Sequence, residues 1–124
     1  MQLNLERPDY LYFLRGADGN GALVNDRRLE RSFVIAPNAL VEDWPVRDAG
    51  AMTPSDLDAL LALQPELVVL GTGAQQRFPP AAVMGACLQR GIGIEAMTNA
   101  AAARTYSVLA GEGRRVVAGF VLPA

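Results

Sequence analysis

Short apolar runs and amphipathic segments alternate along the second half of the chain. Leu67 to Leu70 is continuously apolar and too short for a helix, which indicates a strand buried on both faces. Ile92 to Met97 and Val116 to Leu122 are two further strand-like runs. With helical segments between them, the three runs predict right-handed parallel crossovers, so that helices cover both faces of one sheet.

Start and stop signals define three helices. Thr53 is a good cap and Pro54 suits the first helical position, while Gly91 favours a left-handed conformation at a helix end. The last helix is alanine-rich, starts at Thr98 or Asn99 and is closed by Gly111. The predicted helices run from Thr53 to Gln64, from Pro80 to Arg90 and from Thr98 to Leu109.

The first half predicts antiparallel strands. Tyr10 to Leu14, Ala22 to Val24 and Ser32 to Ala36 are strand-like, and the glycine- and asparagine-rich turn at 16–21 accepts positive φ at little cost. We expect a meander of these three strands beside the parallel part. Trp44, before a proline, is expected to pack on the sheet as a hydrophobic anchor, with exposed recognition as the alternative. The whole predicts one α/β domain covering residues 1–124.

The absence of two residue types limits the chemistry. The chain has no histidine and no lysine, and all its basic residues are arginine. Histidine is the usual acid or base near neutral pH, and lysine forms Schiff bases and the P-loop phosphate clamp. Cys87 is the only cysteine, so neither an internal disulfide nor a cysteine zinc cluster can form. We expect an inert core thiol, no metal and no cofactor.

Charge and hydropathy indicate where the protein acts. The net charge is -2 with both signs mixed along the chain, which argues against a nucleic-acid or anionic-membrane partner. No apolar window is long enough to span a membrane, and residues 1–9 lack the apolar core of a secretory signal and the arginine-rich pattern of a presequence. These features predict a cytoplasmic protein without direct membrane insertion.

One candidate ligand site is the glycine turn Gly71-Thr72-Gly73. It follows a buried strand, a place where α/β folds often bind phosphate through backbone amides. Glu95 follows about twenty residues later, where a dinucleotide fold places its ribose-binding acid. Gln76 and the prolines at 79–80 depart from that fingerprint. The turn is therefore either an anion or nucleotide site or a steric device that turns the strand.

A second candidate is a dense polar cluster near the end of the chain. Glu95 and Glu112 could form an acid/base pair for a slow enzyme. The commoner outcome is a structural network in which these acids pair with arginines. The cluster comprises Glu95, Thr98, Arg104, Thr105, Tyr106, Glu112 and Arg114.

These motifs resemble a family of small domains of unknown function. The family includes a mitochondrial assembly factor for respiratory complex I, an adipogenesis-associated domain protein and many bacterial members. The resemblance covers nearly the whole chain, including Trp44. It rests on Leu70-Gly71-Thr72-Gly73, Gly91-Ile92, Ile94-Glu95-Ala96-Met97, Ala102-Ala103-Arg104-Thr105-Tyr106 and Glu112-Gly113-Arg114.

The resemblance implies a bacterial member with a three-layer fold and a central mixed sheet in which one strand runs against the others. It implies no established catalysis. It also implies a polar pocket. The chain departs from the family pattern at Thr98-Asn99 and Ser107. The implied pocket residues are Gly71, Thr72, Gly73, Glu95 and Arg104, and the predicted structural network adds Thr98, Thr105, Tyr106, Glu112 and Arg114.

Two functional hypotheses follow. The first is a non-catalytic cytoplasmic protein that binds another protein and assists assembly of a membrane or respiratory complex. The second is a domain that binds a small molecule, nucleotide or anion at the glycine turn, with Glu95 and Arg104 orienting the ligand.

Overall fold

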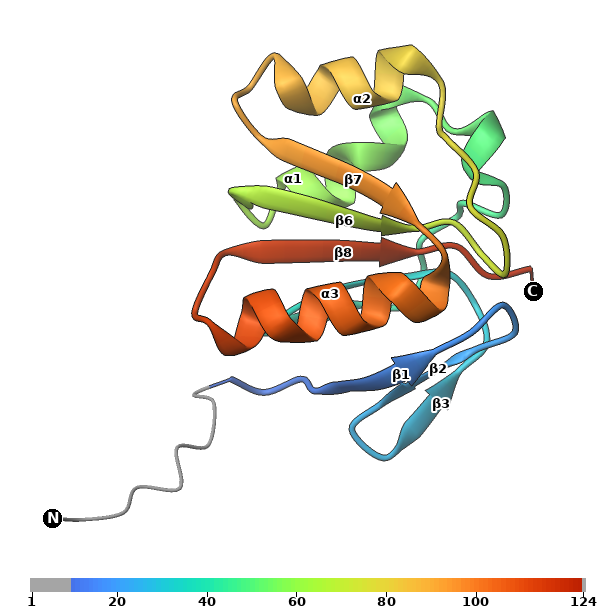
Figure 1. The fold of residues 1–124 in the computed structure, drawn as a ribbon, viewed down its shortest axis with the longest axis vertical. Helices are drawn as coiled ribbons and strands as arrows, with labels where there is room; N and C mark the ends of the chain where they lie inside the picture. The colour runs from blue at the N-terminus through green and yellow to red at the C-terminus, as the bar shows by residue number, and fades with distance from the viewer. Residues whose placement is uncertain (1–9, 124) are drawn as a thin grey trace, which may run out of the picture.

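The strands of the protein form two sheets. The computed structural model describes residues 10–123 (Figure 1). A three-stranded antiparallel sheet has the order β1-β2-β3, and a five-stranded mixed sheet has the order β5-β4-β8-β6-β7. The elements are β1 (Leu14–Ala17), β2 (Ala22–Val24), β3 (Arg27–Leu29), β4 (Phe33–Ala36), β5 (Ala39–Val41), η1 (Ala49–Ala51), η2 (Pro54–Leu57), α1 (Asp58–Leu61), β6 (Leu67–Gly71), α2 (Ala81–Leu88), β7 (Gly93–Met97), α3 (Asn99–Gly111) and β8 (Val116–Phe120).

The order of the parallel strands places the two longer helices on opposite faces. β6 pairs in parallel with both β7 and β8. The chain therefore crosses outward from β6 to β7 through α2, then back past β6 to β8 through α3. Right-handed crossovers in opposite directions put their helices on opposite sides of the sheet. β4 is antiparallel to β5 and β8, so one strand runs against the other four, as the resemblance implied.

Each face of the five-stranded sheet has its own apolar core. One face packs under α1, α2 and the segment carrying Trp44. The other packs under α3 and the three-stranded sheet, which lies beside α3 in Figure 1. The first core includes Val34, Trp44, Leu57, Leu60, Val68, Leu70, Val83, Cys87, Ile94 and Val117. The second includes Leu14, Val24, Leu29, Phe33, Ile35, Val69, Ala102, Tyr106, Val116 and Phe120.

Trp44 is the anchor that the sequence predicted. Its side chain is buried, and its indole N–H donates a hydrogen bond to the Asp56 carbonyl at 2.9 Å. The ring covers Gly119 of β8 so closely that an added Cβ there would lie 2.7 Å from it. The alternative of an exposed recognition residue is therefore wrong.

The first half of the chain differs from the predicted meander. Phe33–Ala36 joins the five-stranded sheet, and the third strand of the small sheet is the polar Arg27–Leu29. Asn25, with φ of 53°, lets the chain reverse directly after β2, so the next strand forms from arginines that carry no apolar signal. The first predicted strand, 10–14, is also wrong, because β1 begins at Leu14.

The second half largely confirms the prediction. β6, β7, β8, α2 and α3 lie where the pattern placed them, and Gly91 has the expected positive φ of 71°. The first helix is instead a 3-10 turn followed by one α-turn. The left-handed residue after α3 is Gly113 and not Gly111. The expectation about residues 1–9 lies outside the described residues.

Candidate functional site

The glycine turn lies at the end of β6, where the strand order reverses. In open α/β sheets a ligand crevice commonly lies at this position, because neighbouring loops diverge to opposite faces. Gly73 has a φ of 113°, which glycine adopts without the steric cost of a Cβ. The sequence therefore identified a position that α/β folds use for binding.

The side chain of Asn99 lies against the glycine turn. Its side chain is fully buried, and its Oδ1 accepts a hydrogen bond from the Gly73 amide at 3.0 Å. Its Nδ2 donates to the carbonyls of Asp18 at 2.9 Å and Val121 at 3.0 Å. The Gly73 amide, which an anion would use, already has an acceptor inside the protein. Asn99 thereby ties the glycine turn to the first and last segments of the described chain.

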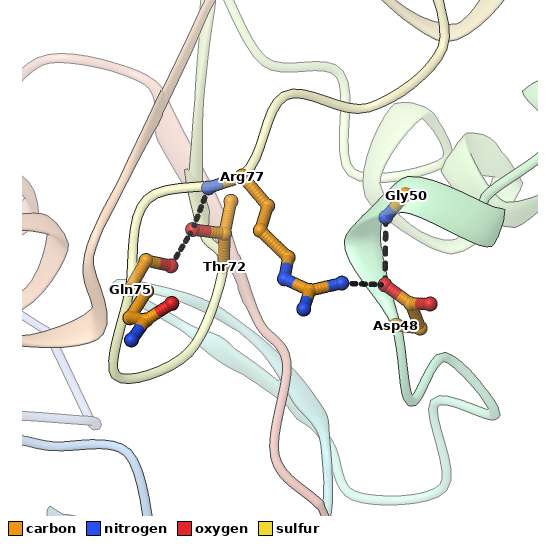
Figure 2. Close-up of polar contacts among 5 residues, drawn as sticks. All are labelled: Asp48, Gly50, Thr72, Gln75 and Arg77. Carbon is orange, nitrogen blue, oxygen red and sulfur yellow. Dashed lines mark hydrogen bonds and ion pairs between the residues drawn. The ribbon is translucent and has the colours of Figure 1, made fainter.

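The loop after the glycine turn is held by its own polar contacts (Figure 2). The Thr72 hydroxyl donates to the Gln75 carbonyl at 2.8 Å and accepts from the Arg77 amide at 3.0 Å. The Arg77 guanidinium lies 3.4 Å from Asp48 Oδ1, which also accepts from the Gly50 amide at 2.9 Å. These contacts close the loop on itself and connect it to η1.

Glu95 lies on β7, an edge strand of the five-stranded sheet. Its side chain is exposed, and it forms no ion pair with any of residues 10–123. Next to it, Gln76 Nε2 donates to the Ala96 carbonyl at 2.9 Å. Covering a carbonyl of an edge strand reduces the capacity of that edge to pair with another chain.

Arg104 lies on α3 and faces a different part of the molecule. It lines a groove between α3 and β1 together with Arg15. The structure thus places Gly71, Thr72 and Gly73 around Asn99, Glu95 on the β7 edge, and Arg104 beside β1. No hydrogen bond or ion pair within residues 10–123 joins Glu95 to Arg104. A ligand pocket built from all five residues stays a prediction.

The polar network of the structure differs from the predicted one. Thr98 caps α3, since its Oγ1 accepts from the Ala101 amide at 3.3 Å. Arg114 pairs with Glu66 at 3.4 Å and not with Glu95 or Glu112. The Tyr106 hydroxyl is buried without a hydrogen-bond partner among the described residues, and burial raises the pKa of Tyr106. No side-chain hydrogen bond within the described part joins Thr105 or Glu112 to this set.

Cys87 is buried in the core under α2. Burial raises the pKa of its thiol, which lowers the fraction of reactive thiolate. The buried position confirms the prediction of a core cysteine, and the inertness of its thiol stays a prediction. Within residues 10–123, no three metal-ligating side chains converge, and no helix of that part is long and apolar enough to cross a membrane.

A cavity lies at the end of the five-stranded sheet opposite to the glycine turn. It has a volume of about 400 Å³ and is lined by residues from the end of α3, the start of β8 and the segment before β5. Of the predicted site residues it contains only Arg114, whose guanidinium already faces Glu66. The rest of the lining combines small and apolar residues with Tyr10, Asn38 and Arg115.

Sequence reasoning missed the role of Asn99 and the position of Arg15. The sequence indicates Asn99 as a possible helix cap and as part of a departure from the family pattern. A polar residue at the start of a helix, just after a parallel strand, can also reach a neighbouring strand end. No sequence motif marks Arg15 as a site residue. It lies at an irregularity of β1 between Leu14 and Gly16, which the sequence pattern does not predict.

Comparison with known proteins identifies the family. A family model described as a protein of unknown function (DUF498/DUF598) matches residues 14–121. The chain belongs to this family. The DUF498/DUF598 match includes every strand and helix described above, and it confirms the resemblance seen in the sequence motifs.

The chain is similar to proteins of solved structure and to curated proteins from other organisms. A solved structure from Xanthomonas campestris is 56% identical, covers 99% of this chain and 93% of its own chain, and has a TM-score of 0.84. Human NADH dehydrogenase [ubiquinone] 1 alpha subcomplex assembly factor 3 is 27% identical over 90% of this chain and 61% of the human protein. The 13 kDa major membrane protein of Francisella tularensis is 32% identical over 57% of this chain and 58% of that protein. The chain spans less than two thirds of the length of these two curated relatives.

Proposed function

We propose that this DUF498/DUF598 protein is a non-catalytic, cytoplasmic protein-binding factor that assists the assembly of a membrane or respiratory complex. The observation that carries the proposal is the similarity to the human complex I assembly factor, which extends over 90% of this chain. The similarity therefore extends over most of the chain and is not confined to a single motif.

The polar chemistry of the chain supports a binding role. The chain contains no histidine and no lysine, the residues that most enzymes use for proton transfer and covalent catalysis. At the crevice where α/β enzymes commonly bind substrates, Asn99 and Thr72 hold backbone groups of the protein itself. Polar groups already bonded within the fold stabilise that fold and are not available to a substrate.

Two experiments test the proposal. In the first, the tagged protein is cross-linked in its source cells, purified and analysed by mass spectrometry. In the second, membrane complexes from cells with and without the gene are compared on native gels. We expect one protein partner to be recovered repeatedly and one assembled complex to decrease without the gene. Recovery of no repeated partner, together with unchanged complexes, would contradict the proposal.

A further inference from the structure

Two arginines line a groove between β1 and α3, the β1–α3 groove. Arg15 comes from β1 and Arg104 from α3, and both side chains are exposed. Neither forms an ion pair with a carboxylate of residues 10–123. The groove has a volume of about 360 Å³ and is lined by Leu14, Arg15, Gly16, Ala17, Ala100, Ala103, Arg104 and Ser107.

Small residues of α3 and an irregular strand form this groove. Ala100, Ala103 and Ser107 follow one strip of α3 at helical spacing, and the Ser107 hydroxyl donates to the Leu14 carbonyl at 3.1 Å. That bond fixes β1 against α3, and the two elements lie side by side in Figure 1. The register of β1 shifts between Leu14 and Gly16, and such bulges redirect the side chain that they contain. Arg15 is that side chain.

The carboxylate nearest in sequence does not neutralise Arg15. Asp18 Oδ1 accepts hydrogen bonds from the amides of Asn20 at 2.8 Å and Gly21 at 2.9 Å. These bonds lower the pKa of Asp18, so its charge is retained and directed into its own turn. The β1–α3 groove therefore has two positive side chains without a carboxylate partner among residues 10–123, although the protein as a whole is acidic.

An apolar surface adjoins the groove. Arg104 also borders a shallow depression of about 280 Å³ with Thr105, Val108 and Leu109. Val108 is 60% exposed, so its side chain is accessible beside Arg104. A ligand that covers both features needs acidic groups and an apolar side chain next to each other.

We propose that the β1–α3 groove binds an acidic segment of a partner protein, with carboxylates on Arg15 and Arg104 and an apolar side chain on Val108. Guanidinium groups bind carboxylates through paired hydrogen bonds. Small-molecule sites bury most of their ligand's surface, whereas Arg15, Ala100 and Arg104 at this groove are exposed, which favours a segment that brings further contacts. This inference rests on the proposed protein-binding function.

Substitutions at Ala100 test the groove without removing its arginines. Ala100 is exposed in the first turn of α3, four residues before Arg104. Ala100→Glu places a carboxylate within reach of Arg104 and at the favourable end of the helix dipole, so the fold should remain stable while the groove is blocked. Ala100→Gln is the matched control, because it adds the same bulk without the charge.

The probe is a short fluorescein-labelled peptide of alternating glutamate and leucine, followed by fluorescence anisotropy. We expect Arg15→Ala, Arg104→Ala and Ala100→Glu each to weaken binding by about tenfold. Ala100→Gln and Arg90→Ala, which removes an exposed arginine after α2, should bind like the unmodified protein. Added salt should weaken binding, and a lysine–leucine peptide should not bind.

Equal binding by all variants, or no binding up to millimolar concentration, would overturn the inference. Binding of free succinate as tight as that of the peptide would also overturn it, because a small dicarboxylate would then be the ligand. Cross-linking in cells separates this inference from the proposed function. A partner captured equally by Arg104→Ala and Ala100→Glu contradicts the groove but not the function, whereas absence of any partner contradicts the function itself.

Discussion

The glycine turn and the β1–α3 groove each contain a set of polar groups, and the two sets differ in how these groups are bonded. At the glycine turn, the Gly73 amide and the Thr72 hydroxyl are bonded to Asn99 and Gln75. In the groove, Arg15 and Arg104 have no carboxylate partner among the described residues. A bonded polar group stabilises the fold, whereas an unpaired exposed charge is available to a ligand.

This comparison teaches that position in an α/β fold does not define a binding site by itself. The turn at the end of β6 has the position and the glycines of an anion site, but a side chain of the same protein occupies it. The groove has no sequence motif, but its two arginines form no ion pair within residues 10–123.

The largest effect is expected for Asn99→Ala. The substitution removes three hydrogen bonds from a fully buried position and leaves backbone groups unpaired, which should lower the free energy of unfolding by about 3 kcal/mol. The change in the free energy of unfolding is measured by urea unfolding. The control, Asn20→Ala, changes an exposed turn residue and should have little effect. A loss below about 1 kcal/mol at Asn99 would mean that the turn is not held as described.

Gly71→Ala should have the next largest effect. An added Cβ would contact Asn99 Oδ1 and lie 2.8 Å from the Phe120 ring, and overpacking of this kind costs about 1–3 kcal/mol. Gly85→Ala is the matched control, because the space around an added Cβ in α2 is open and alanine stabilises a helix interior by about 0.5–1 kcal/mol. Thermal unfolding should therefore shift in opposite directions for the two variants; a shift in the same direction would contradict the packing at Gly71.

Tyr106→Phe should leave the protein as stable or raise the free energy of unfolding by up to about 1 kcal/mol. The hydroxyl is buried without a partner in the described part of the chain, and removing an unpaired buried polar group avoids its desolvation cost. Denaturant unfolding provides the measurement. A loss of more than about 1 kcal/mol would show that the hydroxyl has a bonding partner in solution.

The smallest effect is expected for the contribution of Glu66 to the dependence of stability on pH. Its carboxylate accepts from the Arg115 amide at 3.0 Å and lies near Arg114, and these contacts lower its pKa below the ordinary value of 4.5. Because the folded-state pKa is the lower one, this stabilisation is present above pH 4.5 and is lost as the pH falls through the folded-state pKa.

Glu66→Gln should therefore weaken the dependence of the melting temperature on pH below about 4.5. Glu112→Gln removes the same charge from an exposed side chain and serves as the control. An unchanged pH profile for Glu66→Gln would contradict the proposed hydrogen bonding.

The sequence predicted the parallel half of the fold well because its signals are local. Leu67 to Leu70 is a buried apolar run, Gly91 accepts a positive φ, and Thr98 caps the helix that follows it. The N-terminal half was predicted poorly, because β3 contains Arg27 and Arg28 and forms through pairing with β2 instead of through an apolar pattern.

The candidate site was harder to predict because its contacts are distant in sequence. The bond between Asn99 and Gly73 joins residues 26 positions apart, and single-residue patterns do not reveal such pairings. The sequence motifs single out Arg104, but they predict Glu95 as its neighbour. The bulge in β1 supplies Arg15 instead.

The most direct test is one titration of the ¹⁵N-labelled protein with the glutamate–leucine peptide, followed by ¹H–¹⁵N NMR spectra. It reports both regions in a single measurement. The account predicts that the backbone signals of Arg15, Arg104 and Ser107 move while those of Thr72 and Gly73 stay in place. Movement of the Thr72 and Gly73 signals with unchanged groove signals would contradict it.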